Sequence, residues 1–363
     1  MTSSGALRSE PTLAMAQRFR LLVLSAVVAT SLVVATVVIP EVLKEKARDW
    51  EAYAAAGQRL SRGLPIYVWE GVAQGASAYL YPPLMAWLWS MGMSPGLWLL
   101  LKAWALGLLV VLGPLAGGRA WPIGVVTAAL VAVHPAVVHD FVLGNVMGFY
   151  AGAIALSLAR AGWLGALPLG AVIAFAAKPF VAPYLLWLAM ERKSDAVRVL
   201  SVGLALTSAG VVLTGPSRYV EYAANLPMMS VMNRPFSGNV GLSSLSGEAG
   251  FVGVLVAWTV TLVTCLRIGG ARAAVVAIAM TLLAQPAIGV AYAAVLAPAL
   301  AVLWHQLPRR AAPLVVVAPL IALIPIIAAI GVAVAAGVPT RAGSSPRRDP
   351  GVTSIVTRGS VSQ

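Results

Sequence analysis

Long apolar runs, separated by short polar segments, follow one another through most of this chain. They cover residues 19–40, 95–117, 121–138, 141–160, 163–177, 180–190, 196–214, 249–266, 272–285, 287–305 and 312–337. Roughly 20 apolar residues cross a bilayer as a helix, and a backbone inside hydrocarbon must satisfy its own hydrogen bonds. The runs lack the two-residue alternation of a membrane β-barrel. They therefore predict an all-α, polytopic transmembrane helix bundle of about 10–12 spans.

The composition excludes most soluble classes of protein. Hydrophobic residues make up 60% of the 363 and charged residues only 10%, against about 25% in a soluble domain. The net charge of +13 comes from basic residues scattered between apolar runs, which is typical of orientation signals rather than of nucleic-acid binding. The single cysteine, Cys265, lies in an apolar run, so neither a disulfide framework nor a cysteine metal site is expected.

The polar segments predict one integral membrane domain over 19–338. A cytoplasmic N-terminus (1–18) precedes it, and a Ser-, Pro- and Arg-rich tail (339–363) reads as disordered. Two outer loops are expected, at 41–80 and 215–250.

Topology depends on the segment 81–93. If it is re-entrant or lies on the surface, the loop arginines, among them Arg160 and Arg267, fall on the cytoplasmic side. Both polar loops then lie on the outer side of the plasma membrane. Candidate chemistry therefore gathers at the outer face.

The first outer loop contains a pattern typical of an amphipathic helix lying on a membrane. Asp49 stands at its start, and Gly63 followed by Pro65 ends it. Its apolar positions recur at three- and four-residue spacing, at Trp50, Tyr53, Gly57, Leu60 and Leu64.

Three ionisable residues stand out, each with two interpretations. Asp49 is either a helix cap or a general base at the membrane surface. Asp140 is either an interfacial residue or a carboxylate facing a cavity or a cation. Lys178, at a predicted turn between two short helices, either extends to the interface or meets a lipid-linked phosphate, with Arg218 and Arg234 as secondary phosphate candidates.

Several short motifs resemble the first outer loop and later segments of glycosyltransferase family 87, whose members are membrane glycosyltransferases of the C-type fold. The likeness covers about residues 15–300. The motifs are Asp49-Trp50-Glu51-Ala52-Tyr53, then Arg62-Gly63-Leu64-Pro65-Ile66-Tyr67, Tyr81-Pro82-Pro83-Leu84, Gly144-Asn145, Ala177-Lys178-Pro179 and Asn239-Val240-Gly241-Leu242. One departure is clear: the segment 285–292 lacks the histidine that family members often carry there.

The resemblance implies an inverting transfer of a sugar, mannose foremost, from a polyprenyl phosphate to a lipid-linked or cell-envelope glycan. Asp49 would be the catalytic base and Lys178 would stabilise the leaving phosphate. No nucleotide-binding loop is present, so the activated donor is expected through the lipid phase, with no metal or cofactor. The substrate-binding candidates are Tyr53, Tyr81, Asp140, Asn145, Lys178, Arg234 and Asn239.

Two other classes remain open. A secondary transporter or lipid flippase also carries broken helices and intramembrane charges, although such proteins usually show two similar halves and no repeat is evident here. A non-catalytic assembly partner is the third possibility. A labelled polyprenyl-phosphate-sugar transfer assay separates the three.

Overall fold

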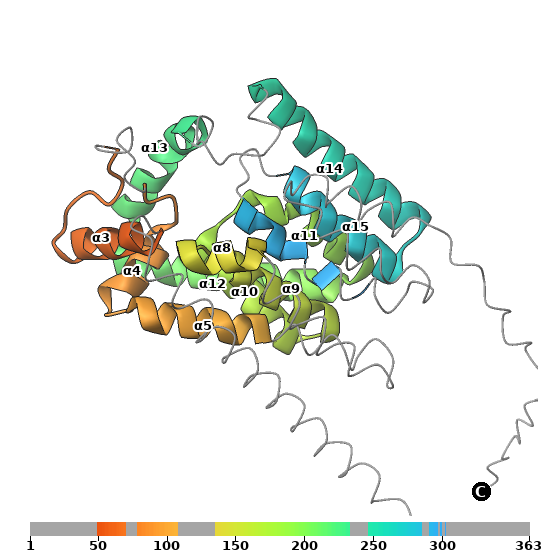
Figure 1. Cartoon of the computed structure of the whole chain (residues 1–363), viewed down its shortest axis with the longest axis horizontal. Coiled ribbons are helices and arrows are strands. Elements are labelled where there is room, and N and C mark those ends of the chain that lie inside the picture. Colours follow the sequence, from red (N-terminus) through yellow and green to blue (C-terminus); the bar gives the residue numbers. More distant parts are fainter. Residues whose placement is uncertain are drawn as a thin grey trace, which may run out of the picture.

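The computed structural model describes residues 49–69, 78–107, 135–232, 246–284 and 290–296, together with 298, 299 and 302. Within these residues the protein is all-helical and contains no strand, which confirms the predicted all-α class (Figure 1). The helices are α3 (Asp49–Ser61), α4 (Pro83–Ser90), α5 (Pro95–Gly107), α8 (Pro135–Leu143), α9 (Met147–Ala159), α10 (Trp163–Ala176), η4 (Pro179–Val181), α11 (Ala182–Glu191), α12 (Lys193–Thr214), α13 (Pro216–Met232), α14 (Gly247–Arg267), α15 (Gly270–Leu283) and η6 (Val290–Leu296).

Two helices in this part of the chain are long and apolar enough to cross a membrane, α12 and α14. A helix of 22 residues such as α12 is about 33 Å long, close to the hydrocarbon thickness of a bilayer. Their apolar side chains point mostly outward: Leu204 is 69% exposed, Val212 is 84% exposed and Phe251 is 64% exposed. A soluble protein rarely leaves such stripes uncovered, so lipid is the solvent that fits them.

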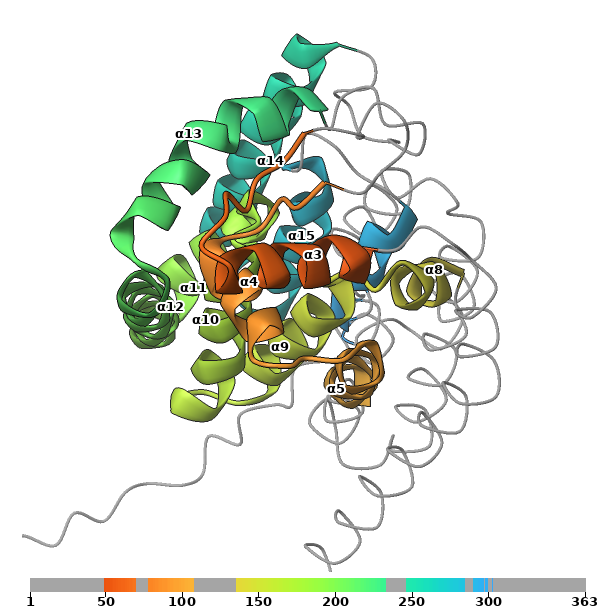
Figure 2. The ribbon, with the colours of Figure 1, turned by 90° about the vertical axis from the view of Figure 1, so that its left-hand side faces the viewer.

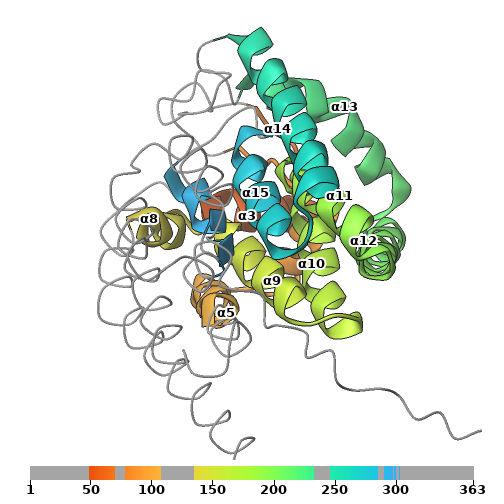
Figure 3. The ribbon, with the colours of Figure 1, turned by 90° about the vertical axis from the view of Figure 1, so that its right-hand side faces the viewer.

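The centre of the bundle is formed by α9 and α15, which are buried on every side. Every residue from Met147 to Ser157 is buried except the half-buried Phe149, and every residue from Ala273 to Leu282 is buried. A helix that is apolar all round lies in a core, with other helices around it. Around this pair, α9 packs on α5 and α10, and α15 packs on α11 and α14 (Figure 3).

The predicted break at the lysine-proline turn is present. Helix α10 ends at Ala176, and the short η4 and α11 follow it directly. The segment 81–93 forms only the eight-residue α4, about 12 Å long, which is too short to cross a bilayer.

Helix α3 has the predicted bounds, but its apolar face lies against protein. Gly63 ends the helix with φ +72°, a conformation that glycine adopts without strain. A Cβ at Gly57 would lie 2.8 Å from the backbone nitrogen of Ser90, so this glycine allows α3 and α4 to pack in contact. Tyr53 is 1% exposed on the same face. The sequence placed this face on the membrane surface; in the structure α4 covers it.

The predicted polar loop 215–250 contains a helix that the sequence analysis missed. Helix α13 starts at Pro216, a residue well suited to a first helical turn, directly after Gly215. It lies with α3 and α4 at one end of the molecule (Figure 1). This end holds the candidate site.

Candidate active site at the start of α3

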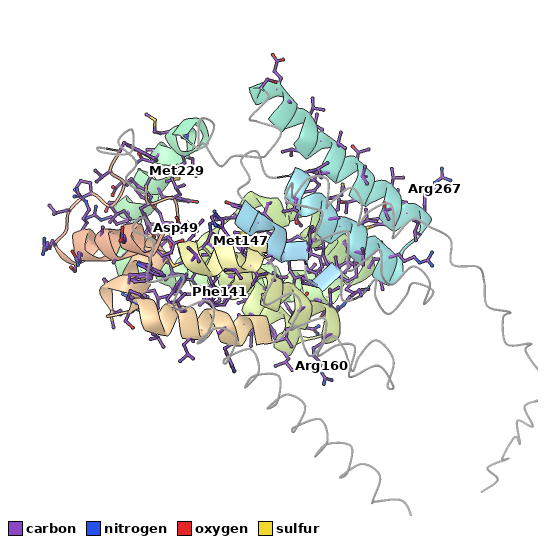
Figure 4. The ribbon with its side chains drawn as sticks, viewed as in Figure 1. Asp49, Phe141, Met147, Arg160, Met229 and Arg267 are labelled. Atoms are coloured by element: carbon purple, nitrogen blue, oxygen red, sulfur yellow. The ribbon has the colours of Figure 1, made fainter. Side chains whose placement is uncertain are left out.

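Asp49 is the first residue of α3 and is partly buried. Its place in the first turn of α3 is compatible with both interpretations of this residue, helix cap and general base. Figure 4 shows Asp49 toward the end formed by α3 and α13, whereas Arg160 and Arg267 lie toward the opposite end. The predicted topology requires this separation of the candidate base from the cytoplasmic arginines.

Lys178 is held in a strained turn. Ala177, directly before it, has φ 37° and ψ 45°, the left-handed conformation that a residue with a Cβ rarely adopts. The backbone N–H of Ala177 still donates to the carbonyl of Ile173 at 2.7 Å, which closes α10. The backbone N–H of Lys178 donates to the Tyr150 hydroxyl at 3.3 Å. The turn therefore has a single, well-fixed course.

Two tyrosines surround the Lys178 ammonium group. Its Nζ donates to the hydroxyl of Tyr292 at 2.7 Å and lies 5.1 Å from the centre of that ring. It also lies 4.9 Å from the centre of the Tyr81 ring. Ring faces attract a cation without neutralising it, so the ammonium stays positive and can still bind an anion.

The predicted contacts Tyr53 and Tyr81 meet in an aromatic cluster between α3 and Lys178. The Tyr53 hydroxyl donates to the Tyr81 hydroxyl at 3.1 Å, with ring centres 5.0 Å apart in an edge-to-face arrangement. The Tyr67 hydroxyl donates to the Tyr81 carbonyl at 2.7 Å. Tyr81 is thus fixed through its hydroxyl and its backbone, and it links α3 to the lysine.

The electrostatic environment of Asp49 suits proton transfer. Burial raises the pKa of this carboxyl from 3.8 to about 6, although the charge of Lys178, and then that of Lys102, pull it down. The charge of Asp140 acts in the raising direction. A base works best when its pKa lies near the working pH, where it is ionised yet still takes a proton. Lys178 is the strongest charged influence on Asp49, so a base and a cation share one site.

Asp140 is fully buried and bound to protein on all sides. Its carboxylate lies 2.8 Å from Nζ of Lys102, which is also fully buried and also donates to the Asp140 backbone carbonyl. The same carboxylate accepts the backbone N–H groups of Met147 and Gly148 at 3.2 and 3.0 Å, at the start of α9. The expectation that Asp140 meets a cation is fulfilled by Lys102, and this geometry favours a positioning role over direct substrate contact.

The turn that joins α8 to α9 carries Gly144 and Asn145. The Asn145 side chain is buried and its Oδ1 accepts the backbone N–H of Val146 at 2.6 Å, so it supports the turn. Gly144 has φ +70°, and a Cβ there would lie 2.6 Å from Cε3 of Trp50. Trp50 is the neighbour of Asp49 in the chain, so this glycine sets how closely the start of α3 approaches α8.

An apolar groove opens beside the lysine turn, with a cavity volume of about 140 Å³. All of its lining side chains are apolar, and they come from α4, α5, α9 and its N-cap Val146, and α10: Met85, Leu88, Trp98, Leu101, Val146, Phe149, Ala171, Val172, Phe175 and Ala176. Ala176 is two residues before Lys178, so the groove and the cation adjoin along the chain.

Two predicted contacts, Arg234 and Asn239, lie outside the described residues. Among those described, no group of three or more His, Cys, Asp or Glu side chains could hold a metal ion. The sequence analysis missed two residues of the site, Lys102 and Tyr292. A lone lysine within an apolar run was a signal for the first, because such a charge needs a buried partner. No local sequence pattern indicated Tyr292.

No protein-family model, no curated protein and no solved structure matches this chain. The resemblance to glycosyltransferase family 87 thus rests on the short motifs quoted above.

Proposed function

We propose that this protein is a membrane glycosyltransferase that moves a sugar from a polyprenyl-phosphate donor to a lipid-linked or cell-envelope glycan. The observation that carries the proposal concerns Asp49 and Lys178: the Tyr53–Tyr81 hydrogen bond joins the helix that begins at Asp49 to the ring whose centre lies 4.9 Å from the Lys178 ammonium. Asp49 is a carboxylate with a pKa near 6, and Lys178 is the strongest charge acting on it. The resemblance adds mannose as the expected sugar and the outer face of the plasma membrane as the place of transfer.

Asp49 acts as the general base. At neutral pH a carboxyl with a pKa near 6 is mostly ionised, yet it takes a proton far more readily than an ordinary aspartate. Partial burial also limits access of water, which would otherwise compete with the acceptor hydroxyl.

Lys178 binds the phosphate of the donor. Its ammonium has three N–H donors, and within the described residues one of them is used, on Tyr292. The remaining donors can serve phosphate oxygens as a point charge. The negative charge that develops on the leaving phosphate is then met by a cation already in place, which stabilises the transition state.

The apolar groove beside the turn suits the polyprenyl chain. It is lined by apolar side chains and adjoins Lys178 through Ala176. A polyprenyl phosphate has this same arrangement of a charged head on a hydrocarbon chain. The lipid would lie in the groove while its phosphate reaches the lysine.

The reaction is a single displacement. The acceptor oxygen attacks the anomeric carbon and loses its proton to the Asp49 carboxylate. A new glycosidic C–O bond forms as the bond between the anomeric carbon and the phosphate oxygen breaks. The electron pair leaves with the polyprenyl phosphate beside Lys178, and the anomeric configuration is inverted.

A transfer assay tests this proposal directly. Purified protein in lipid vesicles would be given a radiolabelled polyprenyl-phosphate sugar and a glycolipid extract as acceptor. We expect a labelled glycolipid from the wild type and almost none from Asp49→Asn. Movement of the donor between leaflets without any glycosidic product would overturn the proposal in favour of a flippase.

A further inference from the structure

An amphipathic helix of a soluble protein buries its apolar side, whereas helix α13 buries its polar side. Its polar side chains point inward. Glu221 accepts the backbone N–H groups of Ile66 and Tyr67 at 2.9 and 3.3 Å, and Asn225 accepts the indole N–H of Trp69 at 2.9 Å. Arg218 donates to the other oxygen of Glu221 at 2.9 Å. These contacts tie α13 to the first loop.

The opposite side of α13, which we call its outer face, is apolar and exposed. It consists of residues at three- and four-residue spacing: Val220, Ala223, Ala224, Pro227 and Met228. Val220 is 69% exposed and Met228 is 43% exposed. No charged side chain interrupts this stripe, whereas the exposed side of α3 carries Glu51 and Gln58. The two helices at this end of the molecule therefore face different surroundings.

The outer face of α13 continues from a candidate membrane span. Helix α12 ends at Thr214, Gly215 turns with φ 88°, and α13 begins at Pro216. The last turn of α12 carries Val212, 84% exposed, and Leu213, 50% exposed. Gly210 leaves room for the Tyr219 hydroxyl, since a Cβ there would collide with it. The exposed apolar side chains of α12 and α13 thus lie on either side of a short turn, where the exposed polar side chain is the uncharged Ser217.

The orientation of α13 fits a helix that lies in a membrane interface. Figures 2 and 3 show α12 nearly end-on, while α13 runs across the view. If α12 crosses the bilayer, α13 lies roughly in the plane of its surface. An interfacial helix has this geometry, with its apolar face roughly 5–10 Å into the boundary between headgroups and acyl chains.

We infer that the outer face of α13 is seated in the boundary layer of the same membrane that α12 crosses, so that lipid is its partner. The polar side of α13, which faces away from the lipid, then holds the segment 63–69 next to the site. This inference rests on the burial and direction of α13 and is independent of glycosyl transfer.

Spin-label accessibility tests the inference. Cys265, the single cysteine, is buried and would be replaced by alanine to give a background protein. Nitroxide labels would be placed by Val220→Cys and Ala224→Cys in protein reconstituted into phosphatidylcholine vesicles. Collision with oxygen, which concentrates in lipid, would be compared with collision with a water-soluble nickel complex. Each labelled variant would be measured only if it elutes as a single species, as the unlabelled protein does.

Two controls set the scale. Ala205→Cys lies on the exposed stripe of α12 and reports lipid, and Gln58→Cys lies on the exposed side of α3 and reports water or headgroups. We expect positions 220 and 224 to collide with oxygen as the α12 control does, and with nickel several-fold less often than the α3 control. Frequent nickel collision would place the outer face in water and overturn the inference. Rare collision with both reagents would mean a protein cover, such as a second copy, and would overturn it too.

Discussion

The ammonium nitrogen of Lys178 lies 2.7 Å from the hydroxyl oxygen of Tyr292, a residue 114 positions further along the chain. Tyr292 belongs to the segment in which this sequence departs from glycosyltransferase family 87, because the expected histidine is missing there. The departure therefore does not leave the lysine without a polar neighbour: a tyrosine hydroxyl accepts its hydrogen bond, and the tyrosine ring packs near it.

Replacement of Lys178 should weaken donor binding. Loss of one charge-assisted contact is worth about 1.5–3 kcal/mol, or roughly ten- to hundredfold in affinity for Lys178→Ala. Tyr292→Phe is the matched control, because it removes the hydrogen bond but keeps the ring and the ammonium, so its effect should be much smaller. Binding of a labelled polyprenyl phosphate to each variant is the measurement. Equal affinity in Lys178→Ala and wild type would remove the phosphate role.

Asp49 should set the pH dependence of transfer. Only the ionised carboxylate takes a proton, so activity should rise with pH to a plateau above about pH 6, the pKa given by burial. Asp49→Asn cannot take a proton and should lose about a hundredfold or more. The rate of labelled-product formation from pH 4.5 to 8.5 checks both points. An Asn variant with near-normal activity would send the search for the base to Glu51.

The same shift should appear in stability. The Asp49 carboxyl has a folded pKa near 6 and an ordinary value of 3.8, so the folded state holds the proton more tightly. The stability gained in this way is complete below about pH 3.8 and is lost as the pH rises through 6. Wild type should therefore lose thermal stability relative to Asp49→Asn between pH 4 and 6, and run parallel to it above. A constant difference across this range would mean that the carboxyl titrates normally.

Gly144 should be intolerant of alanine. Gly144→Ala introduces a left-handed residue, at roughly 1–2 kcal/mol, and also a collision with Trp50. Gly63→Ala has the same backbone demand but nothing within 4 Å, so it isolates the backbone part. We expect the first variant to be less stable than the second by about 1–3 kcal/mol, measured by thermal unfolding in detergent. Adding Trp50→Leu should restore much of the loss; failure to do so would place the collision elsewhere.

Lys102 should be essential for stability. Lys102→Met leaves the Asp140 carboxylate buried without its cation, which costs about 3–5 kcal/mol. The double variant with Asp140→Asn removes the charge and should recover part of that loss. The pair of the partly exposed Arg198 with Asp195 serves as control, and Arg198→Met should cost about 1 kcal/mol or less because Asp195 keeps its ion pair with Arg192. Similar losses in both single variants would show that the buried Lys102–Asp140 pair contributes no more to stability than the control pair.

Local signals were enough to predict α3 and the broken helix at Lys178. Asp49 and Gly63 bound α3 because a helix starts and stops where its backbone groups find partners or a glycine turns the chain. Lys178-Pro179 interrupts a helix because proline disfavours the helical conformation of the residue before it. These features depend on a few neighbouring residues, so the sequence alone carries them.

The long-range contacts could not be predicted from the sequence. Tyr292 reaches Lys178 only through the packing of η6 near η4, which no local pattern encodes. The sequence analysis predicts a polar loop over 215–250, whereas Pro216–Met232 forms helix α13, whose polar residues include Arg218, Glu221 and Asn225. Their three- and four-residue spacing is helical, and in the structure they face the first loop. In a membrane protein a polar stripe can mark the inside of a helix as well as its outside.

The pairing of Lys102 with Asp140 also has a consequence for biosynthesis. In the predicted topology, α5 emerges from the ribosome with a lysine in an apolar span, which lowers its tendency to insert by about 2.5–3.5 kcal/mol. Its partner carboxylate follows 38 residues later in the chain. Helix α5 is therefore expected to remain beside the translocon until α8 arrives, so that the two charges enter the bilayer already neutralised. The order of synthesis would thus be coupled to the assembly of the bundle.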